Sequence, residues 1–206
     1  LDALAVPFEV DGQAVYVSAG IGVALYPEDG ETAEVLLSRA DATLHQAKAD
    51  GRGSLRFFSP EIMLRAQERL SLEAELRRAL EQGEFRVHYQ PQLHLGERAV
   101  TGLEALVRWQ HPQRGLIAPG EFISLAEESG LIVPLGNWVL QEAGRQMRQW
   151  RDEGRAPGYV AVNLSALQLD GEGFADSVRA MLQANGLAPE CLELEITESC
   201  LMPDRI

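Results

Sequence analysis

Polar side chains interrupt three apolar strands that the sequence predicts after about residue 100, and their types suit metal-ion binding. Side chains alternate along a strand, so Glu104 and Arg108 share one face of the segment Gly102–Trp109. Asn163 ends the apolar run that begins at Val160, and Glu195 lies on the face opposite the leucines of its own strand. These three strands therefore each offer an oxygen ligand.

Carboxylate and amide oxygens without histidine or cysteine favour a hard cation, Mg²⁺ or Mn²⁺. Such an ion promotes hydrolysis of phosphate esters, and Arg108 could bind a phosphate beside it. In a parallel α/β barrel, active sites assemble at the C-terminal ends of the strands, where we expect Glu104, Asn163 and Glu195 to meet. The same pattern also fits polar side chains that face solvent on half-exposed strands. The pattern alone does not distinguish such side chains from a metal site.

Strands alternate with helices after residue 83, which predicts parallel βα units. Hydrophobic periodicity places the elements within a few residues. The expected strands are 85–95, 100–109, 159–163 and 192–197, and the expected helices are 135–152 and 173–185.

The first part of the chain has a different, complete pattern. Two strands, 8–10 and 13–25, flank the hairpin signal Asp11-Gly12, and a helix over 32–50 and a strand over 55–58 follow. Ser59-Pro60 then opens a helix that ends before Gly83. We place the domain boundary at this helix, which gives residues 1–59, a linker or first helix over 60–82, and 83–206.

The composition argues against nucleic-acid binding, a cysteine metal site and membrane contact. A formal net charge of −13 disfavours binding to a nucleic-acid polymer. Cys191 and Cys200 form no metal-binding pair and are expected to be reduced thiols of a cytoplasmic protein. No run of 18 apolar residues occurs, so we expect no membrane contact within this chain. Because the chain does not begin with Met, we expect it to be part of a longer protein, and an upstream membrane segment stays open.

From Glu68 onward the sequence resembles the EAL domain family, through a series of motifs in the family's order and spacing. They are Tyr89-Gln90-Pro91-Gln92, Glu104-Ala105-Leu106-Val107-Arg108-Trp109, His111-Pro112, Asn163-Leu164-Ser165 and Glu195-Ile196-Thr197-Glu198-Ser199. The resemblance implies a TIM-like (β/α) barrel that hydrolyses cyclic di-GMP to linear pGpG with Mg²⁺ or Mn²⁺. It also implies that Glu104, Asn163 and Glu195 are the metal ligands, with Glu104 the catalytic residue among them.

The resemblance assigns substrate-binding roles as well. Arg108 resembles the family's phosphate-binding residue, and Gln90 and Leu106 resemble positions that line the dinucleotide pocket. Glu198 resembles the glutamate that stabilises a mobile loop over the metals. Because all these motif residues are present, the resemblance favours an active phosphodiesterase.

The upstream segment resembles the end of a GGDEF domain. The motifs that carry this resemblance are Ser18-Ala19-Gly20-Ile21-Gly22, Tyr26-Pro27, Ala40-Asp41, Ala47-Lys48, Gly51-Arg52 and Phe57-Phe58. The GGDEF signature itself does not occur in these 206 residues, so the sequence does not argue for cyclase activity. The expected fold is thus α/β: a partial barrel of EAL type preceded by the α+β tail of a GGDEF domain.

The resemblance leaves two functions open. The family's later half should carry an Asp-Asp pair, a lysine and a final glutamate, none of which appears before Ile206, so we expect the 206-residue fragment alone to be inactive. The alternative is a catalytically inactive receptor that binds cyclic di-GMP and transmits a signal between GGDEF and EAL domains. A homodimer is a further expectation from the resemblance.

Overall fold

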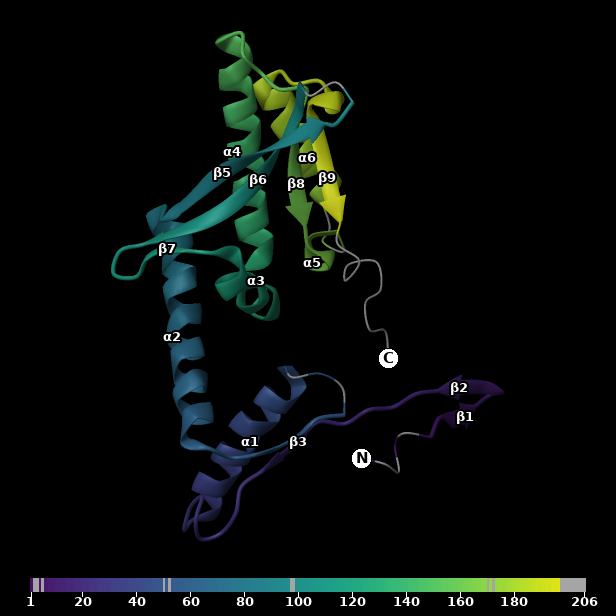
Figure 1. The fold of residues 1–206 in the computed structure, drawn as a ribbon, viewed down its shortest axis with the longest axis vertical. Coiled ribbons are helices and arrows are strands. Elements are labelled where there is room, and N and C mark those ends of the chain that lie inside the picture. The colour runs from purple at the N-terminus through teal and green to yellow at the C-terminus, as the bar shows by residue number, and fades with distance from the viewer. Residues whose placement is uncertain are drawn as a thin grey trace. The chain divides into compact units, whose positions relative to one another are not determined.

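The chain is an α/β protein, described by a computed structural model for residues 1, 4, 6–49, 51, 53–96, 99–169, 171 and 173–196. It divides into two compact units, Leu1–Ser71 and Leu72–Ile206. Helix α2 (Pro60–Gln82) runs across this division. Figure 1 shows the helices and strands of both units.

The first unit contains a hairpin and a β-α-β motif. Strands β1 (Phe8–Val10) and β2 (Gln13–Val15) pair antiparallel, and Asp11 and Gly12 form their turn with φ of 51° and 78°. Strand β3 (Ile21–Val23) pairs in parallel with β4 (Leu55–Phe57), and α1 (Ala33–Ala49) connects them.

The prediction of a single strand over 13–25 is wrong, because this segment pairs with two different strands. Its beginning pairs with β1, its later part pairs with β4, and residues 16–20 between them belong to no strand. Helix α1 packs so closely on β3 that a Cβ at Gly22 would lie 2.3 Å from the carbonyl oxygen of Ala40. A glycine at this position therefore permits the β3–α1 contact.

The second unit is built on a mixed sheet. Strands β5 (Phe85–His94) and β6 (Ala99–His111) pair antiparallel, and β6, β8 (Tyr159–Leu164) and β9 (Leu192–Ile196) are parallel. The strand order is β5-β6-β8-β9, with β7 (Gly115–Ile117) paired to β6. The helices are α3 (Pro119–Glu128), α4 (Ile132–Asp152), α5 (Ala166–Leu169) and α6 (Phe174–Asn185), and a 3₁₀ turn spans Pro189–Cys191.

Most of the expected elements of this unit are confirmed, and the differences are three short elements and one strand pairing. The helix over Pro60–Gln82 has the expected bounds. Strand β7 and helices α3 and α5 were not predicted, because segments of three to ten residues give only a weak periodic pattern. The first strand pair, β5 and β6, is antiparallel, and the expected parallel units begin with β6.

Two clusters of buried side chains hold the sheet to its helices. The first surrounds Trp109, which is fully buried and packs against Phe85 and Phe122 with ring centroids 5.9 and 5.8 Å apart. In the second, Leu140 of α4 and Met181 of α6 pack against the sheet. Helices α4 and α6 thus cover one face of the sheet (Figure 1).

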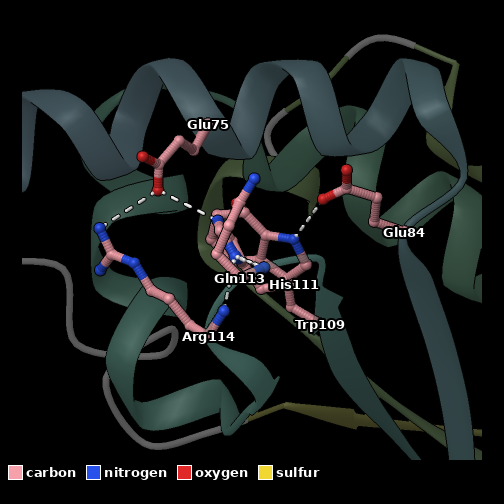
Figure 2. A network of polar contacts seen from close by, with 6 residues as sticks. All are labelled: Glu75, Glu84, Trp109, His111, Gln113 and Arg114. Carbon is pink, nitrogen blue, oxygen red and sulfur yellow. Dashed lines mark hydrogen bonds and ion pairs between the residues drawn. The ribbon is translucent and has the colours of Figure 1, made fainter.

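A polar network joins the last turns of α2 to the end of β6 (Figure 2). The His111 ring is buried, and its Nδ1 accepts hydrogen bonds from the backbone N–H groups of Gln113 and Arg114, both at 3.1 Å. Because Nδ1 accepts, Nε2 carries the proton and donates to Glu75 Oε2 at 3.2 Å. The same Glu75 oxygen lies 3.3 Å from the Arg114 guanidinium.

Replacing His111 by alanine should destabilise this unit, because two backbone N–H groups and Glu75 lose a buried partner. We expect a loss of about 2 kcal/mol, which lowers the unfolding midpoint by about 4–8 °C for a unit of this size. Calorimetry on the full natural-length protein measures the shift. His88→Ala removes an exposed histidine of β5 and serves as the matched control. Equal midpoints for the two variants would contradict this role of His111.

Candidate active site

One face of the sheet carries every predicted site residue that the structure describes. Residues opposite each other on paired strands lie on the same face. Gln90 is opposite Glu104, Glu104 is opposite Ala161, and Asn163, two residues after Ala161, is opposite Glu195. Alternation along β6 adds the remaining two positions. The full set on this face is Gln90, Glu104, Leu106, Arg108, Asn163 and Glu195.

The opposite face of the same strands is apolar and buried, which fixes the orientation of the polar one. Ala105 of β6 and Val160 and Val162 of β8 are at most 3% exposed and lie in the cluster with α4 and α6. A shift of one residue in any strand would place these side chains in solvent and the polar ones in the core. Burial of the apolar face thus places the acidic side chains together on the opposite face of the sheet.

Glu104 and Asn163 are in direct contact. The Asn163 Nδ2 group donates to Glu104 Oε1 at 2.7 Å, although 59 residues separate the two along the chain. Asn163 lies near the C-terminal end of β8, as expected, whereas Glu104 lies in the middle of the long strand β6. Only Gly102–Ala105 of β6 pair with β8. Glu104 lies within this paired segment, which brings its side chain close to Asn163 of β8.

Glu195 meets a residue from the other edge of the sheet. The Gln92 Nε2 group donates to Glu195 Oε1 at 3.1 Å, yet Gln92 is on β5 and Glu195 on β9. In a flat sheet these strands would lie about 14 Å apart, since adjacent strands are about 4.8 Å apart. The contact therefore shows that the sheet curls around the polar face, as the expected partial barrel requires.

Arg108 lies on this face without an acidic partner among the described residues. Its guanidinium donates to the backbone oxygen of Val107 at 2.8 Å, and the residue opposite it is Arg86. Gln90 is exposed and Leu106 is half-buried. An arginine without a carboxylate partner is suited to binding an anion such as phosphate.

Tyr89 anchors β5 next to Gln90 from the apolar side. Its ring packs edge-on against Trp150 of α4, with centroids 4.8 Å apart. Burial raises the pKa of the Tyr89 phenol, and the negative charge of Glu142 raises this pKa further. Tyr89 therefore stays neutral and acts as a packing residue, while its neighbour Gln90 faces the site.

A buried glutamine supports the turn that follows Asn163. Gln168 of α5 accepts a hydrogen bond from the backbone N–H of Ser165 at 3.3 Å through its Oε1. Gln168 packs so tightly against α4 that a Cβ at Gly136 would lie 2.0 Å from its amide nitrogen. Gln168 was not predicted from the sequence, because nothing in a four-residue helix indicates that its side chain turns inward.

The donor groups on this face fit a hard divalent cation. Glu104 and Glu195 supply carboxylate oxygens, and Asn163 supplies an amide oxygen, a set that Mg²⁺ and Mn²⁺ prefer. Among the described residues no group of three His, Cys, Asp or Glu side chains is placed to hold a metal ion, and the third predicted ligand, Asn163, is an amide. Glu198, the predicted loop-stabilising residue, lies outside the described residues, as does Cys200.

Residues 73–205 match the family model of the EAL domain. This chain belongs to the EAL domain family. Residues 1–54 match the model described as "Diguanylate cyclase, GGDEF domain". Both resemblances predicted from the motifs are thereby confirmed, and so is the fold class.

Two relatives match nearly the whole of this chain. The chain is 49% identical over 198 residues to the bifunctional diguanylate cyclase/cyclic di-GMP phosphodiesterase MucR of Pseudomonas aeruginosa, covering 96% of this chain and 29% of MucR. It is 46% identical over 196 residues to the cyclic di-GMP phosphodiesterase NbdA of the same organism, covering 95% and 25%. This EAL-containing chain thus spans less than a third of these relatives.

A solved structure of the PaMucR phosphodiesterase in complex with c-di-GMP has the same fold. It is 52% identical in sequence and has a TM-score of 0.62, and the match covers 65% of this chain and 54% of that one. In the described part of this chain, no helix has the length and apolar character needed to cross a membrane.

Proposed function

We propose that the protein hydrolyses cyclic di-GMP to linear pGpG in bacterial second-messenger signalling and requires Mg²⁺ or Mn²⁺. One observation carries the proposal: Asn163 donates to Glu104 at 2.7 Å and lies opposite Glu195 on a curled sheet. MucR and NbdA, which match nearly all of this chain, are both named as cyclic di-GMP phosphodiesterases, and this supports the choice of substrate.

The six predicted site residues of the polar face have separate roles in the proposed reaction. Glu104, Asn163 and Glu195 would hold the divalent ion, and Arg108 would bind a phosphate of the substrate. Gln90 and Leu106 would line the dinucleotide pocket. When bound, the ion would polarise a phosphoryl oxygen and lower the pKa of a water molecule.

The proposed reaction consumes one water molecule and changes no oxidation state. The water oxygen forms a bond to the phosphorus of one phosphodiester, and the bond from that phosphorus to a ribose 3′ oxygen breaks. The 3′ oxygen receives a proton, and the product is linear pGpG. The two negative carboxylates of the site would repel the phosphate, which is why the proposal requires both the cation and Arg108.

The test is turnover of cyclic di-GMP by the full natural-length protein with Mg²⁺ or Mn²⁺, followed by chromatography of the nucleotides. Formation of pGpG supports the proposal. Tight binding of cyclic di-GMP without formation of pGpG would support the inactive receptor instead. A protein that neither binds nor hydrolyses cyclic di-GMP would contradict both functions. The proposed homodimer needs its own measurement, sedimentation of the same protein.

Replacing Arg108 by alanine should weaken use of the substrate. A hydrogen bond to a charged group contributes about 1.5–3 kcal/mol, so we expect kcat/KM for cyclic di-GMP to fall about 10- to 100-fold. Arg179→Ala is the control, because Arg179 is an exposed residue of α6 that pairs with Asp176. An Arg108 variant with the kcat/KM of the Arg179 variant would remove Arg108 from the proposed site.

A further inference from the structure

Gln92 is the residue of the polar face whose contacts the proposed function does not explain. It is half-buried on β5 and lies opposite Gly102, against which the Tyr159 ring packs. Its Nε2 donates to Glu195 Oε1 at 3.1 Å. Its Oε1 is buried and has no hydrogen-bond partner among the described residues.

We propose that Gln92 is a positioning residue, which fixes the Glu195 carboxylate in the orientation that binds the divalent ion. This inference rests on the proposed function, because it assigns Glu195 as a ligand. A carboxylate only accepts hydrogen bonds, so the amide must present its NH₂ group to Glu195. One oxygen of Glu195 is then bonded to Gln92, and the other is oriented for the ion.

A hydrogen bond of this kind limits the freedom of a ligand before the ion arrives. Glu195 has three rotatable side-chain bonds, and a carboxylate that samples several orientations must lose that freedom on binding. Residues that bond to metal ligands typically contribute 10- to 100-fold to metal affinity for this reason. Gln92 reaches Glu195 from the far edge of the sheet, so it also fixes the ligand relative to β5, where Gln90 lies.

The unpartnered Gln92 oxygen supports a role in binding rather than in folding alone. A buried amide oxygen without a donor costs free energy, and native structures rarely retain one without a reason. Since the orientation of the amide is set by Glu195, Oε1 cannot turn away to find a donor in the chain. The unpartnered oxygen is thus the cost of holding the NH₂ group against Glu195.

The alternative is a structural tether that joins β5 to β9 and nothing more. A tether would affect unfolding but not the affinity for metal ions. Binding of Mn²⁺ to the full natural-length protein, followed by electron paramagnetic resonance of the free ion, separates the two. The variants are Gln92→Leu, the same-length Gln92→Met, the ligand variant Glu195→Ala, and Gln110→Leu, which removes an exposed glutamine of β6.

We expect Gln92→Leu and Gln92→Met to raise the dissociation constant for Mn²⁺ about 10- to 100-fold, Glu195→Ala to raise it further, and Gln110→Leu to leave it unchanged. Because Met fills the same space as Gln, the Met variant still decides the question if Leu disturbs folding. Mn²⁺ affinity that falls in Glu195→Ala but not in either Gln92 variant would overturn the inference and leave the proposed function standing. Unchanged affinity in Glu195→Ala as well would overturn both.

Discussion

Glu104→Gln should reduce kcat for cyclic di-GMP hydrolysis about a thousandfold, the largest effect that we expect from a single substitution. The change keeps the size of the side chain but removes the negative charge that a divalent ion requires. Charge stabilisation by such an ion contributes several kcal/mol to the transition state, and each 1.4 kcal/mol corresponds to about tenfold in rate. The measurement is steady-state formation of pGpG at saturating Mg²⁺ or Mn²⁺.

Glu193→Gln is the matched control for that experiment. Glu193 is an exposed carboxylate on β9, on the same face as Glu195, and it lies opposite Ala161 rather than Asn163. Substitutions at such a surface position usually change free energies by at most about 0.5 kcal/mol, so kcat should stay within about twofold of the wild type. Equal losses in the two variants would show that general charge, and not the position of Glu104, controls the rate.

Removal of divalent cations should abolish hydrolysis by the full natural-length protein. Without the ion, Glu104 and Glu195 place two uncompensated negative charges beside an anionic substrate. We expect turnover to fall at least about 100-fold in excess chelator and to return when Mg²⁺ or Mn²⁺ is added. Sodium chloride at the same ionic strength should not restore it, because a screening salt does not supply an ion that the oxygen ligands bind tightly.

The same experiment separates loss of chemistry from loss of folding. The buried clusters around Trp109 and around Leu140 are apolar and do not depend on a metal ion. Thermal unfolding in chelator should therefore keep a cooperative transition. Full turnover in the presence of excess chelator would contradict the assignment of Glu104, Asn163 and Glu195 as metal ligands.

The sequence predicted the parts of this site that depend on local periodicity. Alternation along β9 correctly separates Glu193 and Glu195 from Leu192 and Leu194, which are partly buried and pack against the apolar cluster. The polar break at Asn163 correctly marks the end of an apolar strand. Both results follow because one buried face fixes the orientation of every second side chain.

Two features that depend on pairing between distant segments were not predicted. Gln92 was part of a recognised motif, but its contact with Glu195 spans 103 residues and exists only because the sheet curls. Likewise, the strand expected over 13–25 carries no local signal for the change of partner from β1 to β4. Alternation shows which face a residue occupies but not which strand lies beside it.

The most direct measurement is a crystal structure of the full natural-length protein with Mn²⁺, in which anomalous scattering locates the ion. We expect an anomalous peak within about 2.2 Å of oxygen atoms from Glu104, Asn163 and Glu195 together. A peak that is bound by other residues, or that touches none of these three side chains, would contradict the metal site on which the proposed function depends.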